Sequence, residues 1–497
     1  MKIVLLPLDE RPCNSLFPKK LFSHGDVEIV TPDELGDKKE PASFEKIVAF
    51  LEKECGHADG LVISMDMLLY GGLIPSRLHH LDKEELLRRL EVLKQIRQAH
   101  PTLPIYAFQV IMRCPDYSSS DEEPDYYAQY GKQIHDLGVA VHRSRLSMDH
   151  VPSVGKMLDA VDRASLDDYI ARREVNRYMN VETLHMVREG ILDALVIPQD
   201  DSARYGYAAL DQQSIRSKIM EYRMEEDVLI YAGADEVGLT LISRMLLHLN
   251  GRQPKIAVKY MSELSKTIIP LYEGCSLSNT ARSHIMSAGG RPTDNLDAAD
   301  IVIFMTAPSG QMEEAISQPS EKTEYCVERN IAEMFMSLRG CLREKKIVTI
   351  SDNAYANGGD LEIVRLLDHS GLLMQVDGYA GWNTSANTLG TAIAEAVDSY
   401  LCGKTPEHQN FLAERYLEDA GYCSVVRAAV TEKLPGTMNY FDVKERDGEV
   451  AKMVQTELLE FAQRDLASIS GRVRLERVSM PWKRMFEIHL EANYQDA

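Results

Sequence analysis

A parallel β/α fold is the class that the sequence predicts. Short apolar runs rich in Val, Ile and Leu alternate with amphipathic stretches along most of the chain, as is typical of strands connected by helices. The apolar runs are nearly continuous, which is expected for strands buried on both faces. At 497 residues the chain exceeds the size that one core usually supports. We therefore expect a large domain with an elaboration, or two domains.

The strands and helices follow from this periodicity. The runs predicted as strands are Ile3–Leu8, Val27–Val30, Gly60–Met65, Ile105–Met112, Ala194–Pro198, Val228–Ala232, Ile256–Tyr260, Ile301–Met305, Ile347–Ile350 and Leu373–Val376. The clearest helices are Lys83–His100, Val181–Glu189, Gln212–Glu225, Ile331–Leu338 and Leu389–Leu401.

The domain organisation is predicted from where strands are missing. Residues 1–403 are expected to form a catalytic β/α domain, in which residues 114–190 are a mostly helical insertion over one end of the sheet. Residues 404–497 are expected to form a helical or mixed C-terminal module that ends in the alternating segment Arg472–Arg477. No internal repeat is evident in the sequence.

Charge and composition exclude several classes of partner. The formal net charge of -21 opposes binding to nucleic acid, which relies on neutralising phosphates. No stretch approaches the roughly 18 apolar residues of a membrane span, and the N-terminal apolar run meets charges too early for a signal peptide. The eight cysteines contain no C-x-x-C pair, which argues against a disulfide framework. We expect a cytoplasmic protein without a membrane partner, and the composition is compatible with a homo-oligomer.

Acidic and polar residues follow many of the predicted strands. Parallel β/α folds place their ligands at the carboxyl ends of strands, so these side chains are candidates for substrate binding or catalysis. A single acid at such a place is most often a helix cap, but caps require neither paired acids nor flanking Asn, Trp and Tyr. Acids at so many strand ends favour a (β/α)-barrel over a doubly wound sheet, which usually has one switch point. The candidates are Asp9, Glu10, Arg11, Asp66, Asp200, Asp201, Asp235, Glu236, Asp352, Asn353, Asn357, Asp360, Tyr379, Trp382 and Asn383.

The segment Tyr231–Gly238 carries the most specific local motif. Its Gly-Ala-Asp-Glu-Val run resembles the strand-end signature of retaining hexosaminidases that use substrate-assisted catalysis. The resemblance implies that Glu236 is the general acid/base and that Asp235 orients the 2-acetamido group of the substrate. It also implies that Arg11 grips sugar hydroxyls, while Trp382 could form an apolar wall under the sugar ring.

A broader resemblance covers residues 1 to about 420. The chain is similar to a bacterial family known chiefly as a domain of unknown function, and this likeness implies no activity. The segments that carry it are Pro7–Pro12 (Pro-Leu-Asp-Glu-Arg-Pro), Gly71–Arg77, Asp352–Asp360 and Ala380–Thr384.

Two polar loops strengthen the prediction of a ligand site. The Asn-Gly-Gly-Asp run that ends at Asp360 suggests a loop whose backbone approaches a ligand closely, although Gly-Gly is also common in plain turns. Asn383 and Asn387 around Trp382 offer amides suited to hydroxyl groups, which a tryptophan in a core would not need.

The leading hypothesis is a glycoside hydrolase that acts on an N-acetyl amino sugar, either a small molecule or an oligosaccharide. One alternative is a divalent-metal-dependent hydrolase or phosphoryl-transfer enzyme with Asp66, Asp200, Asp201 and Asp352 as ligands. Another is a sugar-binding protein without catalysis. No cofactor is expected, because H-E-x-x-H, P-loop and clean G-x-G-x-x-G motifs are missing, and the lack of G-x-S-x-G disfavours a serine hydrolase.

Overall fold

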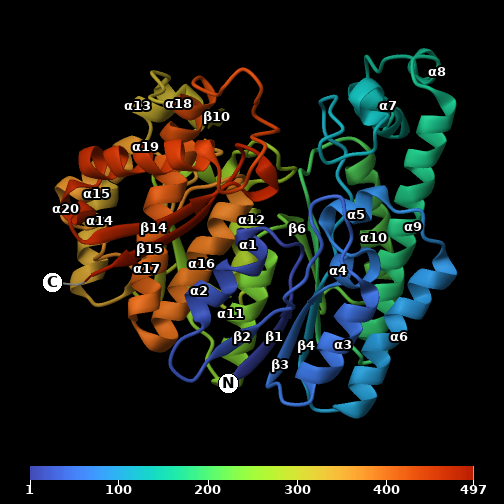
Figure 1. Cartoon of the computed structure of the whole chain (residues 1–497), viewed down its shortest axis with the longest axis horizontal. Helices are drawn as coiled ribbons and strands as arrows, with labels where there is room; N and C mark the ends of the chain where they lie inside the picture. Colours follow the sequence, from blue (N-terminus) through green and yellow to red (C-terminus); the bar gives the residue numbers. More distant parts are fainter. Residues whose placement is uncertain (496–497) are drawn as a thin grey trace. The chain divides into compact units, whose positions relative to one another are not determined.

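A computed structural model describes residues 1–495, and the chain divides into two compact units. Unit 1 comprises Met1–Glu10, Ile29–Gly238 and Tyr272–Gly274, and unit 2 comprises the remaining segments. Each unit has its own parallel sheet and its own hydrophobic core. Figure 1 shows the helices and strands coloured along the chain from the N-terminus to the C-terminus.

The sheet of unit 1 has six strands in the order β2-β1-β3-β4-β5-β6. Its pairs from β1 to β6 are parallel. This order places the topological switch point between β1 and β3, where open α/β sheets usually bind ligands. The strands are β1 Lys2–Leu6, β2 Glu28–Val30, β3 Gly60–Ser64, β4 Ile105–Phe108, β5 Ala194–Gln199 and β6 Val228–Ala232.

One face of this sheet packs on helices to form a single apolar core. Alternate residues of the strands, such as Val4 and Leu6 of β1, point into it, because successive side chains of a strand face opposite sides. The helices contribute apolar stripes spaced one turn apart, for example Leu86, Leu90 and Leu93 of α6. The helices of unit 1 are α3 Phe44–Cys55, α4 Met65–Tyr70, α5 Leu73–Leu78, α6 Lys83–Ala99, α7 Tyr127–Arg145, α8 Val154–Leu158, α9 Arg163–Arg188 and α10 Tyr207–Tyr222.

The predicted insertion at residues 114–190 consists of helices α7, α8 and α9, without a strand. These helices have a small core of their own, in which the rings of Tyr127 and Tyr169 lie 5.8 Å apart. The segment is therefore a local helical elaboration between β4 and β5.

The sheet of unit 2 has five strands in the order β13-β11-β9-β7-β8, all parallel. Strand β9 shows how both faces are buried: Val302 and Phe304 belong to one core, whereas Ile301, Ile303 and Met305 belong to another. This explains its continuous apolar sequence. The strands are β7 Lys255–Tyr260, β8 Arg291–Pro292, β9 Ile301–Met305, β11 Ile347–Ser351 and β13 Gly378–Ala380; the short strands β10 Glu313–Glu314 and β12 Tyr355–Ala356 pair separately.

Helices and a C-terminal hairpin complete unit 2. A long helix runs through α17, the π-helix η3 and α18, and the hairpin β14–β15 is antiparallel. The elements are α1 Pro12–Ser15, α2 Phe17–Phe22, α11 Val237–Leu249, η1 Glu263–Thr267, α12 Leu277–Ser287, η2 Ala315–Ser317, α13 Thr323–Cys326, α14 Ile331–Arg343, α15 Leu361–His369, α16 Ser385–Cys402, α17 Pro406–Arg415, η3 Tyr416–Val426, α18 Arg427–Thr431, α19 Glu449–Asp465, α20 Ala467–Ser470, β14 Val473–Ser479, η4 Pro481–Lys483 and β15 His489–Tyr494.

The two sheets share one topology. When the main strands of each unit are numbered in chain order, both sheets contain the order 2-1-3-4-5, and unit 1 adds a sixth strand at the edge. This is the flavodoxin-like doubly wound order. The sequence shows no internal repeat, so the repetition is visible only in the strand order.

The structure confirms the parallel β/α class and corrects three details. The preference for a barrel is wrong, because both main sheets are open. The predicted strand Leu373–Val376 is a turn region, and the strand lies at Gly378–Ala380. The division into units also differs from the expected boundary after residue 403, because the described residues beyond 403 belong to the unit that contains β7–β13. Among residues 1–495, no helix has the length and apolar character needed to cross a bilayer.

Replacement of Gly378 tests the packing between β13 and its neighbours. A Cβ at this position would lie 2.6 Å from Thr349 Oγ1 and 2.7 Å from Glu395 Cβ. We expect Gly378→Ala to lower the free energy of unfolding by about 1–3 kcal/mol through overpacking. Gly340 in α14 is the matched control, since a Cβ there meets nothing within 4 Å. Gly340→Ala should instead stabilise by roughly 0.5–1 kcal/mol. Denaturant unfolding measures both free energies. A free energy of unfolding that is the same in Gly378→Ala as in wild type would contradict the close packing.

Candidate functional site

Buried arginines bind the predicted acids that follow β5 in unit 1. Arg77 Nη2 lies 2.5 Å from Asp200 Oδ2, and Arg113 Nη1 lies 2.8 Å from Asp201 Oδ2. Arg77 and Arg113 also pair with Glu122 and Glu123. We call these six residues the acid–arginine cluster. Its carboxylates serve as acceptors for the guanidinium groups, since a buried charge requires a paired partner.

Asp66, at the end of β3, lies near this cluster and is buried. Its Oδ2 accepts a hydrogen bond of 2.8 Å from the backbone N–H of Val110. Burial raises its pKa from 3.8 to about 7, although Arg77 acts in the opposite direction. The pKa of Asp201 is likewise raised to about 6, by burial and then by the neighbouring charge of Asp200. Both groups therefore exchange protons closer to neutral pH than an ordinary aspartate.

Asp235 and Glu236, predicted as the catalytic pair, lie at the end of β6 in unit 1 and are buried. Glu236 Oε2 accepts a hydrogen bond of 3.0 Å from the backbone N–H of Ala234. Gly233 has φ +145°, and a Cβ there would lie 2.0 Å from Glu236 Oε1. The carboxylate is thus folded back over its own loop, which explains the need for glycine at position 233.

The end of β1 supplies predicted residues to both units. Asp9 and Glu10 belong to unit 1, where Asp9 is buried, and Arg11 belongs to unit 2. Arg11 Nη1 lies 3.5 Å from Glu487 Oε2, and its guanidinium lies 4.8 Å from the ring centroid of Trp482. In unit 2, Arg11 thus contacts an acid and an aromatic ring from the C-terminal segment.

Asp352, at the end of β11, is the centre of a hydrogen-bond network in unit 2. Its Oδ1 accepts from Thr306 Oγ1 at 2.6 Å, and its Oδ2 accepts from Tyr379 Oη at 2.8 Å and from the N–H of Asp360 at 2.7 Å. Asp360 in turn pairs with the buried Arg329. Burial and the charge of Asp360 raise the pKa of Asp352 to about 6. The network links the ends of three strands to the start of α15.

The Asn-Gly-Gly-Asp loop packs closely against the protein itself. A Cβ on Gly359 would lie 2.0 Å from Tyr379 Oη, and one on Gly358 would lie 2.4 Å from Ser424 Oγ. The glycines are therefore needed for contact with these two hydroxyl groups. Asn353 is also buried, and its amide donates to a backbone carbonyl at 3.0 Å.

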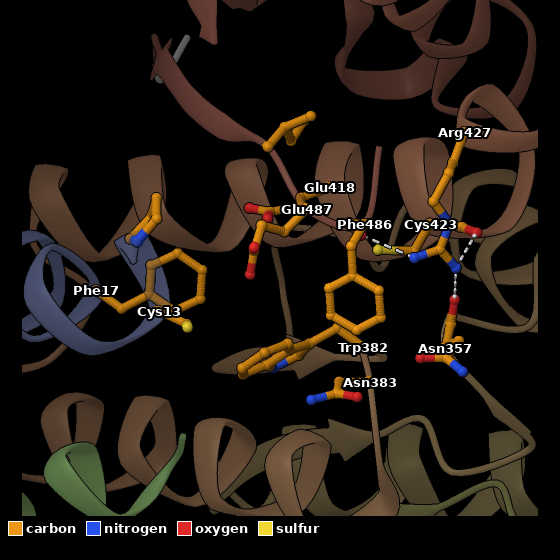
Figure 2. A pocket seen from close by; sticks show the side chains of 12 residues that line it. Cys13, Phe17, Asn357, Trp382, Asn383, Glu418, Cys423, Arg427, Phe486 and Glu487 are labelled. Carbon is orange, nitrogen blue, oxygen red and sulfur yellow. Dashed lines mark hydrogen bonds between the residues drawn. The ribbon is translucent and has the colours of Figure 1, made fainter. Parts of the chain in front are cut away.

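A pocket in unit 2 brings three of the predicted residues together (Figure 2). We call it the Trp382 pocket. It combines three aromatic rings, two amides, two carboxylates and one guanidinium group. After burial, the nearby charge of Glu487 is one of the causes that raise the pKa of Glu418. The lining residues are Pro12, Cys13, Phe17, Asn357, Trp382, Asn383, Glu418, Cys423, Arg427, Phe486, Glu487 and Ile488.

The π-helix η3 positions one wall of this pocket. Glu418 and Cys423 are five residues apart, which is the i→i+5 hydrogen-bond spacing of a π-helix, and Arg427 begins the α-helix that follows. Arg427 Nη2 donates to the carbonyl of Asn357 at 2.7 Å, and its Nη1 donates to the carbonyl of Phe486 at 2.9 Å. Arg427 thereby ties the helix to two loops of the pocket.

The two carboxylates of the pocket have different surroundings. Burial raises the pKa of Glu418, even though its partner Arg415 lowers it. Glu487 pairs with Arg484 at 2.9 Å and with Arg11 at 3.5 Å, so two guanidinium groups stabilise its negative charge. Burial also raises the pKa of Cys423 to about 12, so that its thiol stays protonated near neutral pH and is a poor nucleophile.

The two asparagines are held by an unusual backbone. Asn357 has φ 62° and Asn383 has φ 50°, both in the left-handed region where Asn is the most tolerated residue after Gly. The N–H of Asn357 donates to the carbonyl of Asn383 at 2.7 Å. Trp382 is fixed by a bond of 3.1 Å from its Nε1 to Thr391 Oγ1. These contacts define the positions of the loop residues before any ligand binds.

The sequence predicted only part of this pocket. Asn357, Trp382 and Asn383 were predicted, whereas Phe17, Glu418, Arg427, Phe486 and Glu487 were not. The missed residues do not follow strands, and a five-residue spacing fits no ordinary helical period. No sequence signal that we recognise would have identified them.

The proposed metal ligands are divided between the two units. Asp352 belongs to unit 2, whereas Asp66, Asp200 and Asp201 belong to unit 1. Within residues 1–495, the one set of three side chains whose donor atoms could hold an ion is His24, Asp398 and Cys402. In unit 1, Asp200 and Asp201 are ion-pair partners of Arg77 and Arg113.

Fold and pocket together define an α/β protein with two open parallel sheets and an aromatic, carboxylate-lined pocket in its second unit. The chain belongs to the DUF4127 family, which carries the description "Protein of unknown function", and the family model matches residues 3–491. This confirms the predicted membership of a family of unknown function. No curated protein matches the chain.

Asp66 provides a test of the raised pKa values. The pKa of Asp66 is about 7 in the folded protein and near 3.8 in the unfolded chain. Between pH 3.8 and pH 7 the folded state therefore binds more protons than the unfolded state does. Stability then falls by about 1.4 kcal/mol per pH unit across this window for each such group. Asp66→Asn should remove this contribution, so the variant gains stability relative to wild type as the pH rises from about 4 to about 7.

Denaturant unfolding at several pH values measures the effect. The control is Asp116→Asn, at an exposed loop residue, which should leave the slope unchanged. A slope identical in wild type and Asp66→Asn would contradict the raised pKa.

Proposed function

We propose that the protein is a glycoside hydrolase and that the Trp382 pocket binds the sugar. The free space of the pocket is about 20 Å³, so its walls have to move apart to admit a sugar ring. The observation that carries this proposal is the combination of aromatic rings, amides and two carboxylates in one pocket. Aromatic faces pack on the apolar face of a sugar ring, while amides and carboxylates bind its hydroxyl groups. The amino-sugar substrate rests on the hexosaminidase resemblance of Tyr231–Gly238.

The rigidity of the aromatic wall supports sugar binding. The rings of Phe17 and Trp382 meet edge to face at 6.0 Å, and Phe17 in turn packs on Phe411 at 5.3 Å. Trp382 is also fixed through its indole N–H. A wall that is ordered in advance binds its ligand with a smaller loss of side-chain entropy.

The two carboxylates of the pocket match the roles that glycoside hydrolysis requires. Glu418, with its raised pKa, is the proton donor to the leaving oxygen. Glu487, which pairs with Arg484 and Arg11, is the second carboxylate and acts as nucleophile or as base for water. A pair of acids whose environments differ in this way is the usual arrangement in such enzymes.

The motif around Asp235 and Glu236 gives a second version of the same proposal. In that version Glu236 is the acid/base and Asp235 orients the acetamido group of the substrate. Glu236 would first have to exchange its bond from the Ala234 N–H for a contact with the substrate. Glu418 and Glu487 line the same pocket as the aromatic rings and amides, so we favour them as the catalytic pair.

The primary experiment is a screen of aryl glycosides, including an N-acetylglucosaminide and an N-acetylgalactosaminide, with Glu418→Gln as the test variant. The variant should lower kcat by about 10²–10⁴-fold on substrates with a poor leaving group, and much less on activated ones, which need little protonation. Glu432→Gln, at an exposed residue at the end of α18, is the control and should retain wild-type rates. Sugar binding without turnover would instead favour a sugar-binding protein, and no activity or binding would contradict the proposal.

The pair Asp235 and Glu236 is tested separately on any substrate that is turned over. If substrate assistance operates, Glu236→Gln lowers kcat about 10²–10⁴-fold for poor leaving groups, and Asp235→Asn impairs good and poor leaving groups alike. We expect both variants to keep near wild-type kcat once their folding is verified by circular dichroism. A leaving-group dependence in Glu236→Gln but not in Glu418→Gln would transfer the acid role to Glu236.

A further inference from the structure

A second group of chemically active side chains lies in unit 2, and none of its members lines the Trp382 pocket. It consists of His24, Asp398 and Cys402, each of which offers one donor atom. These nitrogen, oxygen and sulfur atoms all lie within 4.8 Å of one another. Among the described residues, no other set of three meets this condition.

Two segments distant in sequence bring the group together. Asp398 and Cys402 are four residues apart on α16, so their side chains share one face of the helix. His24 follows α2, and its Nε2 lies 2.7 Å from Asp398 Oδ1 across a separation of 374 residues. His24 and Asp398 are buried, whereas Cys402 is exposed. The group is thus preformed on its inner side and open to solvent on its outer side.

A further histidine orients the carboxylate of Asp398. His408 Nδ1 lies 2.8 Å from Asp398 Oδ2, and its Nε2 lies 2.8 Å from the carbonyl oxygen of Asp377. Since a carbonyl oxygen and an ionised carboxylate only accept, each of these two contacts requires a proton on the ring nitrogen that makes it. Outer contacts of this kind fix the ligands of metal sites in their binding geometry. The arrangement around Asp398 has this second layer.

We propose that His24, Asp398 and Cys402 bind a zinc ion, with water in the fourth position. Imidazole nitrogen, carboxylate oxygen and thiolate sulfur are the donor types that Zn²⁺ accepts, and a site with three protein ligands keeps one position open. The Cys402 thiol loses its proton to form the Zn–S bond. The proton through which His24 Nε2 contacts Asp398 moves to Nδ1, so that Nε2 can bind the ion, and one proton in total is released to solvent without any change of oxidation state.

The expected consequence is stabilisation of unit 2. The ion would join the segment after α2 to the end of α16, and these segments are far apart in the unfolded chain. A ligand that binds the folded state alone raises its stability in proportion to the logarithm of ligand concentration. The site is not part of the Trp382 pocket, so glycosidase activity is not expected to depend on it.

Zinc titration of the chelator-treated full-length protein tests the proposal, with calorimetry as readout. Wild type should bind one equivalent tightly and unfold at a higher temperature with zinc. Cys402→Ser and His24→Gln should each weaken binding by more than about tenfold, the lower limit seen even when outer contacts of a site are removed. Cys326→Ser is the matched control, because Cys326 is also exposed but lies outside the group.

Cobalt substitution keeps the test decisive if His24→Gln fails to fold. Wild type and Cys326→Ser should show the ultraviolet charge-transfer band of a cobalt–thiolate bond, and Cys402→Ser should lack it. The proposal is overturned if wild type shows no band and binds no tight equivalent, or if Cys402→Ser retains both. Loss of the band in Cys326→Ser alone would show that Cys326, and not Cys402, binds the metal, and this result would also overturn the proposal.

Discussion

A carboxylate buried at the end of a parallel strand must find hydrogen-bond donors, and this requirement shapes both units. Parallel strands deliver their carboxyl ends to one edge of a sheet, so polar residues there come close together. Asp352 meets the requirement with donors from Thr306, Tyr379 and the backbone of Asp360. The same contacts bring the Asn-Gly-Gly-Asp loop against Tyr379, where a side chain at Gly359 would not fit. The loop sequence is therefore a consequence of the buried acid.

Unit 1 meets the same requirement with guanidinium groups. Arg77 and Arg113 lie between the acids that follow β5 and those of the segment after β4. Because Asp200 and Asp201 each direct an oxygen at an arginine, they are engaged as ion-pair partners. A cluster of acids in a sequence does not distinguish a metal site from such a salt-bridge cluster, because the arginines that decide between them are distant in sequence.

Most strands could be predicted because their signal is local. All the predicted strands except Leu373–Val376 are present, since a short apolar run buried on both faces is recognisable by itself. The exception is apolar apart from Gln375, but its residues lie in a turn, and the strand that follows contains only Gly378–Ala380. The prediction of a barrel was wrong for a different reason. It was inferred from acids at many strand ends, and those strands belong to two sheets, each of which has its own edge.

The candidate site was predictable only where it lies on loops after strands. Trp382 and Asn383 follow β13 directly, so the strand-end argument found them. The strand-end argument could not predict Glu418. Which side of the helix the Glu418 side chain occupies depends on the π-helical winding of η3, and that winding depends on tertiary contacts that the local sequence does not reveal.

One such contact is visible at Gly421, where a Cβ would lie 2.8 Å from the ring of Phe461 on α19. The glycine lets the wide turn of the π-helix approach α19 closely, and that turn carries Glu418 and Cys423 to the pocket. Glu487 reaches the pocket from the segment between η4 and β15. Both carboxylates of the pocket thus lie beyond residue 403, in the part of the chain that the sequence suggested was a separate module. The sheet of unit 2 supplies the aromatic and amide residues after β13, and the C-terminal segment supplies the acids, so neither part of the unit has the complete pocket without the other.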